Sequence, residues 1–164
     1  MSRAVLSLGS NLGDRLAFLR LAVEGLGEAV RAVSPVYETA PWGVTDQPDF
    51  LNAVLVAESA ELDAWGWLRR GQELEREAER RREQRWGPRT LDVDVVTVDG
   101  VTSNDPELLL PHPGTPSRAT VLVPWLAVEP GAELPGYGRL AELVGALPAE
   151  ELAGVRFRGD LVLR

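Results

Sequence analysis

The chain has 164 residues and a formal net charge of −8, which predicts a single domain over residues 1–164 and argues against a general nucleic-acid binder. It contains neither cysteine nor lysine, which excludes disulfides, zinc–thiolate sites, thiol nucleophiles, P-loops and Schiff-base chemistry. It lacks a long apolar run and a signal-peptide pattern, so we expect a cytoplasmic protein without a membrane span.

The first part of the sequence predicts a strand, a helix and a second strand. Residues 4–8 form a short apolar run, and a Gly-Ser-Asn turn then leads into leucines at helical spacing. We expect Ser10 or Asn11 to cap this helix. The turn can hold an anion or simply end the strand, and both interpretations stay open. Residues 30–37 alternate loosely and predict the second strand, with one proline inside it.

A long irregular loop over residues 39–50 contains prolines, a glycine and Trp42. Loops of this length inside a compact domain are usually functional. The next strand, residues 50–59, places Phe50 and Asn52 on one face together with valines. A buried asparagine needs partners for its amide. Asn52 therefore either binds the edge of a flat heteroaromatic ring on which Phe50 stacks, or ties down the long loop.

A charged helix is predicted over residues 61–84, with one stripe that begins apolar and continues with polar residues. Eight of the seventeen arginines lie between Arg69 and Arg89, and we expect residues 79–84 to lead the helix into a mobile loop. The two polar residues of the stripe either face a pocket or are solvated. The predicted stripe consists of Leu62, Trp65, Leu68, Gln72 and Glu75.

The segment RWGPRTLDVDVV, residues 85–96, sets a basic turn directly ahead of a strand with two aspartates. Asp92 and Asp94 share one face of this strand, with α-carbons roughly 6–7 Å apart. Two such carboxylates repel, and a divalent cation removes the repulsion. A pair of acids alone is more often a solvated strand face. Arg89 in the preceding turn favours a site for Mg²⁺ and a polyphosphate instead.

Beyond this strand the signals are weaker. Asp99 and Gly100 predict a hairpin turn, with a second edge strand at residues 101–102. His112, the only histidine, lies between two prolines and by itself indicates no role. Arg118 opens a helix or turn. Two further elements are predicted toward the C-terminus: a short helix over residues 140–147 and a last strand over residues 155–163.

Taken together, these segments resemble the 6-hydroxymethyl-7,8-dihydropterin pyrophosphokinase family. RWGPRTLDVDVV is close to the family signature, and VLSLGSNLGDR, YETAPWG, DQPDFLNAV and LPHP occur in the expected order. The resemblance implies a Mg²⁺-dependent enzyme of folate biosynthesis that transfers pyrophosphate from ATP to the pterin alcohol, giving AMP. It also implies a ferredoxin-like α+β sandwich, with a mainly antiparallel sheet, helices packed on one face and additional C-terminal elements. The predicted order β-α-β-β-α-β agrees with this fold.

The resemblance also implies roles for matching positions, with ATP and the pterin as substrates of an expected monomer that binds neither nucleic acid nor membrane. Two Mg²⁺ ions are expected on Asp92 and Asp94, and Asp92 also adjoins the pterin. The residues expected to contact ATP are Gln72, Glu75, Arg80, Arg82, Trp86, Arg89, His112 and Arg118. Arg82 and Arg89 join the two aspartates as the expected catalytic residues. The residues expected to contact the pterin are Thr39, Ala40, Trp42, Phe50 and Asn52.

The chain departs from the family pattern at Glu79, at Thr120 and in the Pro-Gly-Thr-Pro run after His112. The closing loop commonly carries a glycine where this chain has Glu79, and Thr120 replaces a second aromatic residue that would complete a sandwich around the pterin. Three rival interpretations remain open at this point: an ordinary kinase that releases ADP, a non-catalytic ferredoxin-like module, and a degenerate homologue.

Overall fold

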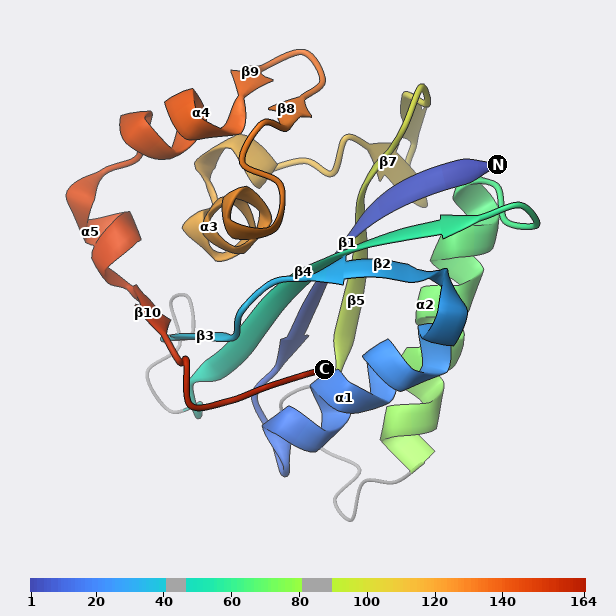
Figure 1. Ribbon diagram of the computed structural model, residues 1–164, viewed down its shortest axis with the longest axis horizontal. Coiled ribbons are helices and arrows are strands. Elements are labelled where there is room, and N and C mark those ends of the chain that lie inside the picture. The colour runs from blue at the N-terminus through green and yellow to red at the C-terminus, as the bar shows by residue number, and fades with distance from the viewer. Residues whose placement is uncertain (41–46, 81–89) are drawn as a thin grey trace.

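The computed structural model describes residues 1–40, 47–80 and 90–164. Within these residues, six antiparallel strands form the central sheet (Figure 1). The order across the sheet is β10-β3-β4-β1-β5, and β2 also pairs with β4. The strands are β1 (Ser2–Ser10), β2 (Val30–Val33), β3 (Tyr37–Thr39), β4 (Phe50–Ser59), β5 (Asp92–Val98) and β10 (Val155–Phe157).

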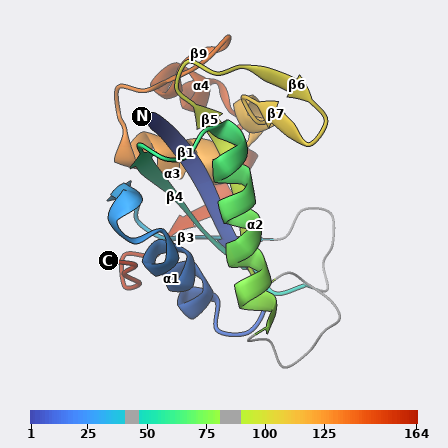
Figure 2. The ribbon, with the colours of Figure 1, turned by 90° about the vertical axis from the view of Figure 1, so that its right-hand side faces the viewer.

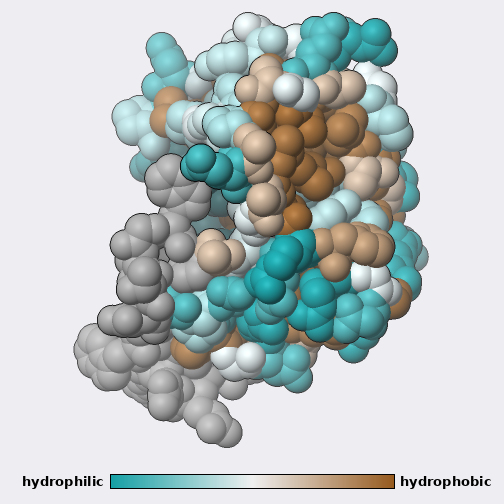
Figure 3. Space-filling model, turned by 90° about the vertical axis from the view of Figure 1, so that its left-hand side faces the viewer, coloured by the Kyte–Doolittle hydropathy of each residue, from teal (hydrophilic) through white to brown (hydrophobic). Residues whose placement is uncertain are grey.

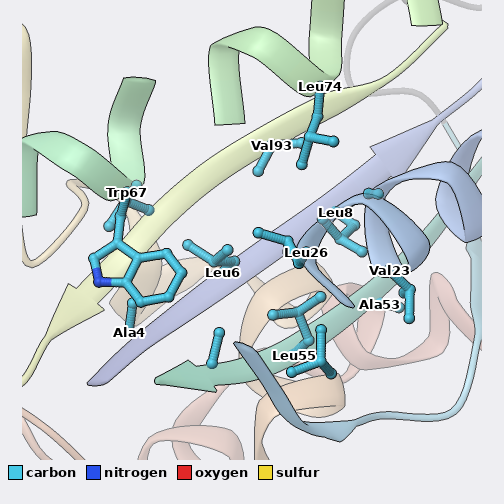
Figure 4. Close-up of a cluster of buried hydrophobic side chains, with 14 of the residues drawn as sticks. Ala4, Leu6, Leu8, Val23, Leu26, Ala53, Leu55, Trp67, Leu74 and Val93 are labelled. Carbon is cyan, nitrogen blue, oxygen red and sulfur yellow. The ribbon is translucent and has the colours of Figure 1, made fainter. Parts of the chain in front are cut away.

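Helices α1 (Arg15–Leu26) and α2 (Ala64–Arg80) cover one face of this sheet, and Figure 2 shows α2 lying across the strands. Trp67 is fully buried between α2 and the sheet, and its indole N–H donates to Ser2 Oγ at 2.8 Å. Figure 4 shows how the apolar side chains of both helices meet those of the strands. This layer contains the larger of two hydrophobic cores.

The C-terminal elements cover the opposite face. Helices α3 (Ala119–Val128) and α4 (Leu140–Ala146) bury Leu122, Trp125 and Leu140 against the valines of β1, β4 and β5. The short helix α5 (Ala149–Ala153) then leads into β10 at the edge of the sheet. The smaller elements are η1 (Gly27–Ala29), β6 (Ser103–Asp105), β7 (Leu108–Leu110), η2 (Thr115–Ser117), β8 (Glu133–Leu134) and β9 (Gly138–Arg139).

The architecture confirms the predicted ferredoxin-like α+β fold, with corrections at the ends of elements. Neither Ser10 nor Asn11 caps α1, because the cap is Asp14, whose Oδ1 accepts the N–H of Ala17 at 3.1 Å. Ser10 donates its hydroxyl to the carbonyl of Thr90 instead. The predicted strand over residues 30–37 is two strands, because the chain bends at Ser34 and Pro35 and both halves pair with β4.

The buried face of α2 also differs from the predicted stripe. The residues of α2 that are buried lie on a neighbouring face of the helix, and several of them are small. The residues of the predicted stripe are only half-buried and lie at the margin of the core. The helix begins at Ala64 and not at 61, because Asp63 accepts the N–H of Gly66. The buried residues of α2 are Ala64, Trp67, Gly71, Leu74 and Ala78.

Two smaller expectations also need correction. The turn at Gly100 exists, but Val101 makes only an isolated bridge to Val98, and the next hairpin consists of β6 and β7. The last strand is shorter than predicted, because only Val155–Phe157 pairs with β3. The helices at Arg118 and over residues 140–147 are confirmed. None of the helices in the described ranges has the length and hydrophobicity needed to cross a membrane.

Candidate active site

A cavity of about 160 Å³ lies where β1, β3, β4 and β5 end beneath the start of α3. It joins the two parts of the site that the sequence predicts separately, namely the paired aspartates and the aromatic–amide face of β4. The residues that line it are Ser7, Gly9, Thr39, Ala40, Phe50, Asn52, Asp92, Asp94, Arg118, Thr120 and Val121.

The acidic wall of this cavity is the first part of β5. Asp92 and Asp94 point toward the cavity, while Val93 between them is buried in the core. Their partners on β1 are Gly9, which has no side chain, and Ser7, which has a small one. These two residues leave space beside the carboxylates. Asp94 is exposed, and the structure gives its carboxylate no hydrogen bond or ion pair with any described residue. This face therefore presents negative charge that a bound cation can neutralise.

The opposite wall is formed by β3 and β4. Asn52 is buried, and its Nδ2 donates a hydrogen bond to Thr39 Oγ1 at 2.7 Å. Thr39 ends β3 where the long loop begins, so Asn52 does tie down one end of that loop. It also lines the cavity beside Phe50, and a Cβ on Gly9 would come within 3.3 Å of Asn52 Oδ1. Both interpretations of Asn52 thus have a structural basis.

Positive charge reaches the cavity from α3. Arg118 is the residue before this helix, and its exposed side chain has no hydrogen bond or ion pair with the described residues. Thr120, in the first turn, lines the same wall. A guanidinium and two carboxylates around one cavity form a suitable environment for an anionic ligand bound together with a metal ion.

Other predicted residues lie outside this cavity. His112 follows β7, where its backbone N–H donates to the carbonyl of Val96 at 2.9 Å and its ring Nδ1 lies 2.8 Å from the carbonyl of Pro113. Arg80 ends α2 and forms an ion pair with Glu77 at 2.5 Å. Four predicted residues lie outside the described ranges: Trp42, Arg82, Trp86 and Arg89.

Gln72 and Glu75 border a second hollow, between α2 and the start of β5. Glu75 Oε2 accepts the N–H of Val93 at 2.9 Å, so this helix glutamate is bonded to the backbone between the two aspartates. That contact explains why a polar residue continues the half-buried stripe of α2. It also shows that α2 supports β5, the strand that carries Asp92 and Asp94, through a hydrogen bond from the side opposite the cavity.

A larger hollow, of about 610 Å³, lies between α1 and α2. Its charged residues are largely paired, with Arg70 bonded to Glu73 and Arg80 to Glu77. Leu21 and Leu74 also line this hollow, but among the described residues no aromatic side chain does so, whereas Phe50 lines the smaller cavity together with the aspartates. The smaller cavity therefore fits a ring-and-phosphate substrate better than the larger hollow does.

Sequence reasoning missed Ser7 and Gly9 as site residues. They alternate on β1, the central neighbour of β5, and their small size is what allows a ligand close to Asp92 and Asp94. The signal was present in the sequence as small residues at alternate positions of an apolar strand. This pattern indicates space for a ligand only once it is known that β1 pairs with β5 and sets Ser7 and Gly9 opposite the two aspartates.

Solved structures with this fold include an HPPK-DHPS protein crystallised in complex with substrates, which superposes with a TM-score of 0.70. The match covers 88% of this chain but only 43% of that longer chain, at 11% identity. A Plasmodium falciparum HPPK-DHPS structure gives a TM-score of 0.69 at 12% identity, over 44% of its chain. These similarities establish the α+β fold class.

The family follows from sequence. The family model for 7,8-dihydro-6-hydroxymethylpterin-pyrophosphokinase (HPPK) matches residues 5–130. A 2-amino-4-hydroxy-6-hydroxymethyldihydropteridine pyrophosphokinase of Mycobacterium leprae is 54% identical over 95% of this chain and 88% of its own length. The Mycobacterium bovis protein of that name is 52% identical, over 82% of this chain and 76% of its own length. The Bacillus subtilis protein of that name is 40% identical, over 74% of each chain. The chain belongs to the HPPK family.

Proposed function

We propose that the protein transfers a pyrophosphoryl group from ATP to 6-hydroxymethyl-7,8-dihydropterin, giving AMP and the pterin diphosphate, as a step of folate biosynthesis. The observation that carries this proposal is the single cavity that unites Asp92 and Asp94 with Phe50 and Asn52. Relatives that share about half of their residues with this chain are named for the same reaction. We further propose that it acts as a cytoplasmic monomer on these small molecules, without a nucleic-acid or membrane partner.

The wall formed by β3 and β4 would hold the pterin. The ring of Phe50 offers a flat apolar surface, and the amide of Asn52 offers a donor and an acceptor to the edge of a heterocycle. Thr39 and Ala40 place backbone groups beside this edge, and Trp42 is expected to complete the pocket. Because Thr120 stands where a second aromatic ring is common, binding relies on Phe50 for stacking.

The donor set of the acidic wall fits magnesium. Asp92 and Asp94 supply carboxylate oxygens, and among the described residues no group of three or more acidic, histidine or cysteine side chains could hold a metal by itself. Mg²⁺ commonly binds through a few carboxylates together with substrate phosphates and water. Two ions held jointly with ATP are expected here, and they would neutralise charge on the phosphates.

The chain's own residues would position the reactants. The hydroxymethyl oxygen of the pterin attacks the β-phosphorus of ATP, and its hydroxyl proton is released to solvent. The bond from that phosphorus to the α–β bridging oxygen breaks, so that AMP leaves with this oxygen. We propose that Arg118, which lines the cavity at the start of α3, contacts the phosphates, and that Arg82, Arg89 and His112 assist it. The proposed ATP contacts also include Gln72, Glu75, Arg80 and Trp86.

The test is a product assay with purified protein, ATP, Mg²⁺ and the authentic pterin alcohol. We expect AMP and the pterin diphosphate in equal amounts, and no turnover when the metal is chelated. ADP as the nucleotide product would make the protein an ordinary kinase. Absence of any nucleotide product, with binding retained, would leave only a ligand-binding module.

A further inference from the structure

The C-terminal segment of α5 and β10 contacts both walls of the candidate active site, although it lies beyond residues 5–130 that the family model matches. We propose that Glu151 and Arg156 are positioning residues, which hold the α3 wall and the β3–β4 wall of the pterin cavity at a fixed separation. This inference rests on the proposed function, because it concerns the same cavity.

Glu151 holds the start of α3. The N–H of Ala119, the first residue of that helix, donates to Glu151 Oε1 at 3.1 Å. First-turn N–H groups lack partners inside their own helix, and Arg118 provides no side-chain cap here. Glu151 therefore caps α3 from a different element. Ala119 stands between Arg118 and Thr120, which both line the cavity, so this cap determines where that wall lies.

Arg156 holds the ends of β3 and β4. Its guanidinium NH2 lies 2.6 Å from Asp49 Oδ2 and 3.7 Å from Glu38 Oε1. Asp49 directly precedes Phe50, and Glu38 directly precedes Thr39 in the sequence. One guanidinium therefore links the residues next to two cavity-lining side chains.

The opposite side of this junction is braced by α1. Arg15 NH1 donates to Glu38 Oε2 at 2.6 Å and to the carbonyl of Asp49 at 2.9 Å. Three guanidinium groups thus contact Glu38, from Arg15, Arg156 and Arg158. Two of them, from Arg15 and Arg156, also hold Asp49. The end of the long loop is fixed at Phe50 by these contacts.

The two anchor points are only five residues apart along a short, ordered segment. Between them, α5 ends at Ala153, with Gly154 as its C-cap, and β10 pairs with β3 in the register Val155 to Thr39. Phe157 also packs edge-on against Tyr37, with ring centroids 5.8 Å apart. Figure 1 shows α5 and β10 running from the α3–α4 layer to the edge of the sheet at β3.

The surface of this segment has two parts. In Figure 3, hydrophobic side chains gather over α4 and α5, and a hydrophilic band lies below them at the level of β10. Leu143, Val144 and Leu147 pack against the hydrophobic core that α3 shares with the sheet. In the hydrophilic band, Arg156 forms ion pairs with Glu38 and Asp49. Because the segment of α5 and β10 contacts one wall through Glu151 and the other through Arg156, a shift at either anchor moves one cavity wall relative to the other.

The test is steady-state kinetics of full-length variants with both substrates. Glu151→Ala and Arg156→Ala should each raise the KM for the pterin about fourfold, the effect of losing one modest hydrogen bond or ion pair. The KM for ATP should change by less than about twofold, as for a remote surface charge. Glu151→Gln should restore the wild-type value, because its amide oxygen still accepts the N–H of Ala119.

The double variant gives the sharpest result. If the segment acts as one clamp, either substitution releases it, and Glu151→Ala with Arg156→Ala should again raise the pterin KM about fourfold. Two independent contacts would instead multiply to about sixteenfold and would overturn the proposal. Glu150→Ala and Arg139→Ala, which remove exposed charges nearby, are the matched controls.

Other outcomes also decide the matter. An unchanged pterin KM in both single variants would refute the clamp, as would an equal rise in both KM values accompanied by a lower Tm. A failure of Glu151→Gln to rescue would refute the capping role. If the wild-type protein binds the pterin but forms no AMP, the proposed function is wrong while the clamp can still be tested. The variants are then compared by the dissociation constant of the pterin in place of its KM.

Discussion

Glu38 and Asp94 are acidic residues on strands of the same sheet, yet their surroundings are opposite. The carboxylate of Glu38 is nearly buried and lies within 3.7 Å of guanidinium nitrogens from Arg15, Arg156 and Arg158. The carboxylate of Asp94 is exposed in the cavity, and the described residues offer it no cation at all. Within the part of the chain that the structure describes, Glu38 thus has three arginine partners and Asp94 has none.

This difference separates charge that stabilises the fold from charge that binds substrate. A carboxylate already bonded to three arginines has little left to offer a metal ion, whereas an unpaired one keeps its oxygens available. Arg15, Arg156 and Arg158 are also not available to bind a phosphate while they form ion pairs with Glu38. The chain has seventeen arginines. The ones that could bind a phosphate are therefore those that have no acid partner among the described residues, such as Arg118.

The largest effect is expected for Asp94→Asn, which tests whether Asp94 binds a metal ion. The substitution keeps the shape but removes one charge from the proposed metal site, so we expect turnover to fall on the order of a thousandfold. The Tm should stay close to the wild-type value, because no described residue pairs with this carboxylate. Single-turnover assays for AMP and thermal unfolding would measure the two effects.

Asp105→Asn is the matched control, since it makes the same change on the exposed hairpin of β6 and β7. It should leave turnover unchanged. If Asp94→Asn kept wild-type turnover, the assignment of the acidic wall to metal binding would be wrong. If it lowered the Tm strongly, Asp94 would belong with Glu38 as a structural acid.

The converse experiment is Glu38→Ala. Removing this carboxylate leaves Arg15 and Arg158 without a shared acceptor, and we expect the free energy of unfolding to drop by about 2 kcal/mol. Urea unfolding would measure this change. The kcat should fall far less than in Asp94→Asn. A loss of kcat comparable to that of Asp94→Asn, without a loss of stability, would contradict a structural role for Glu38.

Asn52 tests the intermediate case of a residue that has a partner and also lines the cavity. Thr39→Val removes the acceptor of its internal hydrogen bond, whereas Asn52→Ala removes the amide itself. If the amide also binds the pterin, Asn52→Ala should raise the pterin KM about tenfold, and Thr39→Val by clearly less. Equal effects of the two variants would indicate that Asn52 only ties down the loop.

The faces of the long strands could be predicted from the sequence. Side chains alternate strictly on a strand, so the placement of Asp92 with Asp94, and of Phe50 with Asn52, follows from spacing alone. The signature segment and its neighbours then indicated the family. The roles assigned to these residues stay predictions until the variants are measured.

Contacts between distant segments could not be predicted in this way. Asp14 caps α1 because the helix begins at Arg15, beyond the reach of Ser10 and Asn11. The side chains of Ser10 and Asn11 instead donate to Thr90 and Gln47, and no local pattern reveals those partners. The buried face of α2 was misplaced for the same reason: Gly71 permits close packing on Val93, which favours a different side of the helix. The anchoring of β10 likewise depends on pairing with β3 across more than a hundred residues, and Glu151 of α5 reaches Ala119 across 32 residues.

The smallest expected effect concerns pH and sharpens the role of Glu38. The hydrogen bond from Arg15 holds the pKa of the Glu38 carboxyl below its ordinary value of 4.5, and Arg158 acts in the same direction against the effect of burial. A pKa that is lower in the folded state means that ionised Glu38 stabilises the fold. This contribution is complete above the unfolded-state pKa and disappears as the pH falls through the folded-state pKa.

Glu38→Gln should therefore destabilise the protein by a constant amount, about 1 kcal/mol, from neutral pH down to roughly pH 5. Below the ordinary pKa of the carboxyl the difference between wild type and variant should shrink, because wild-type Glu38 becomes protonated and loses its ion pairs. Urea unfolding of both proteins across this range would measure it. If the difference in free energy of unfolding between wild type and Glu38→Gln stayed constant down to about pH 3, the arginines would not stabilise the ionised form of Glu38. Glu38 would then not be the structural acid that we contrast with Asp94.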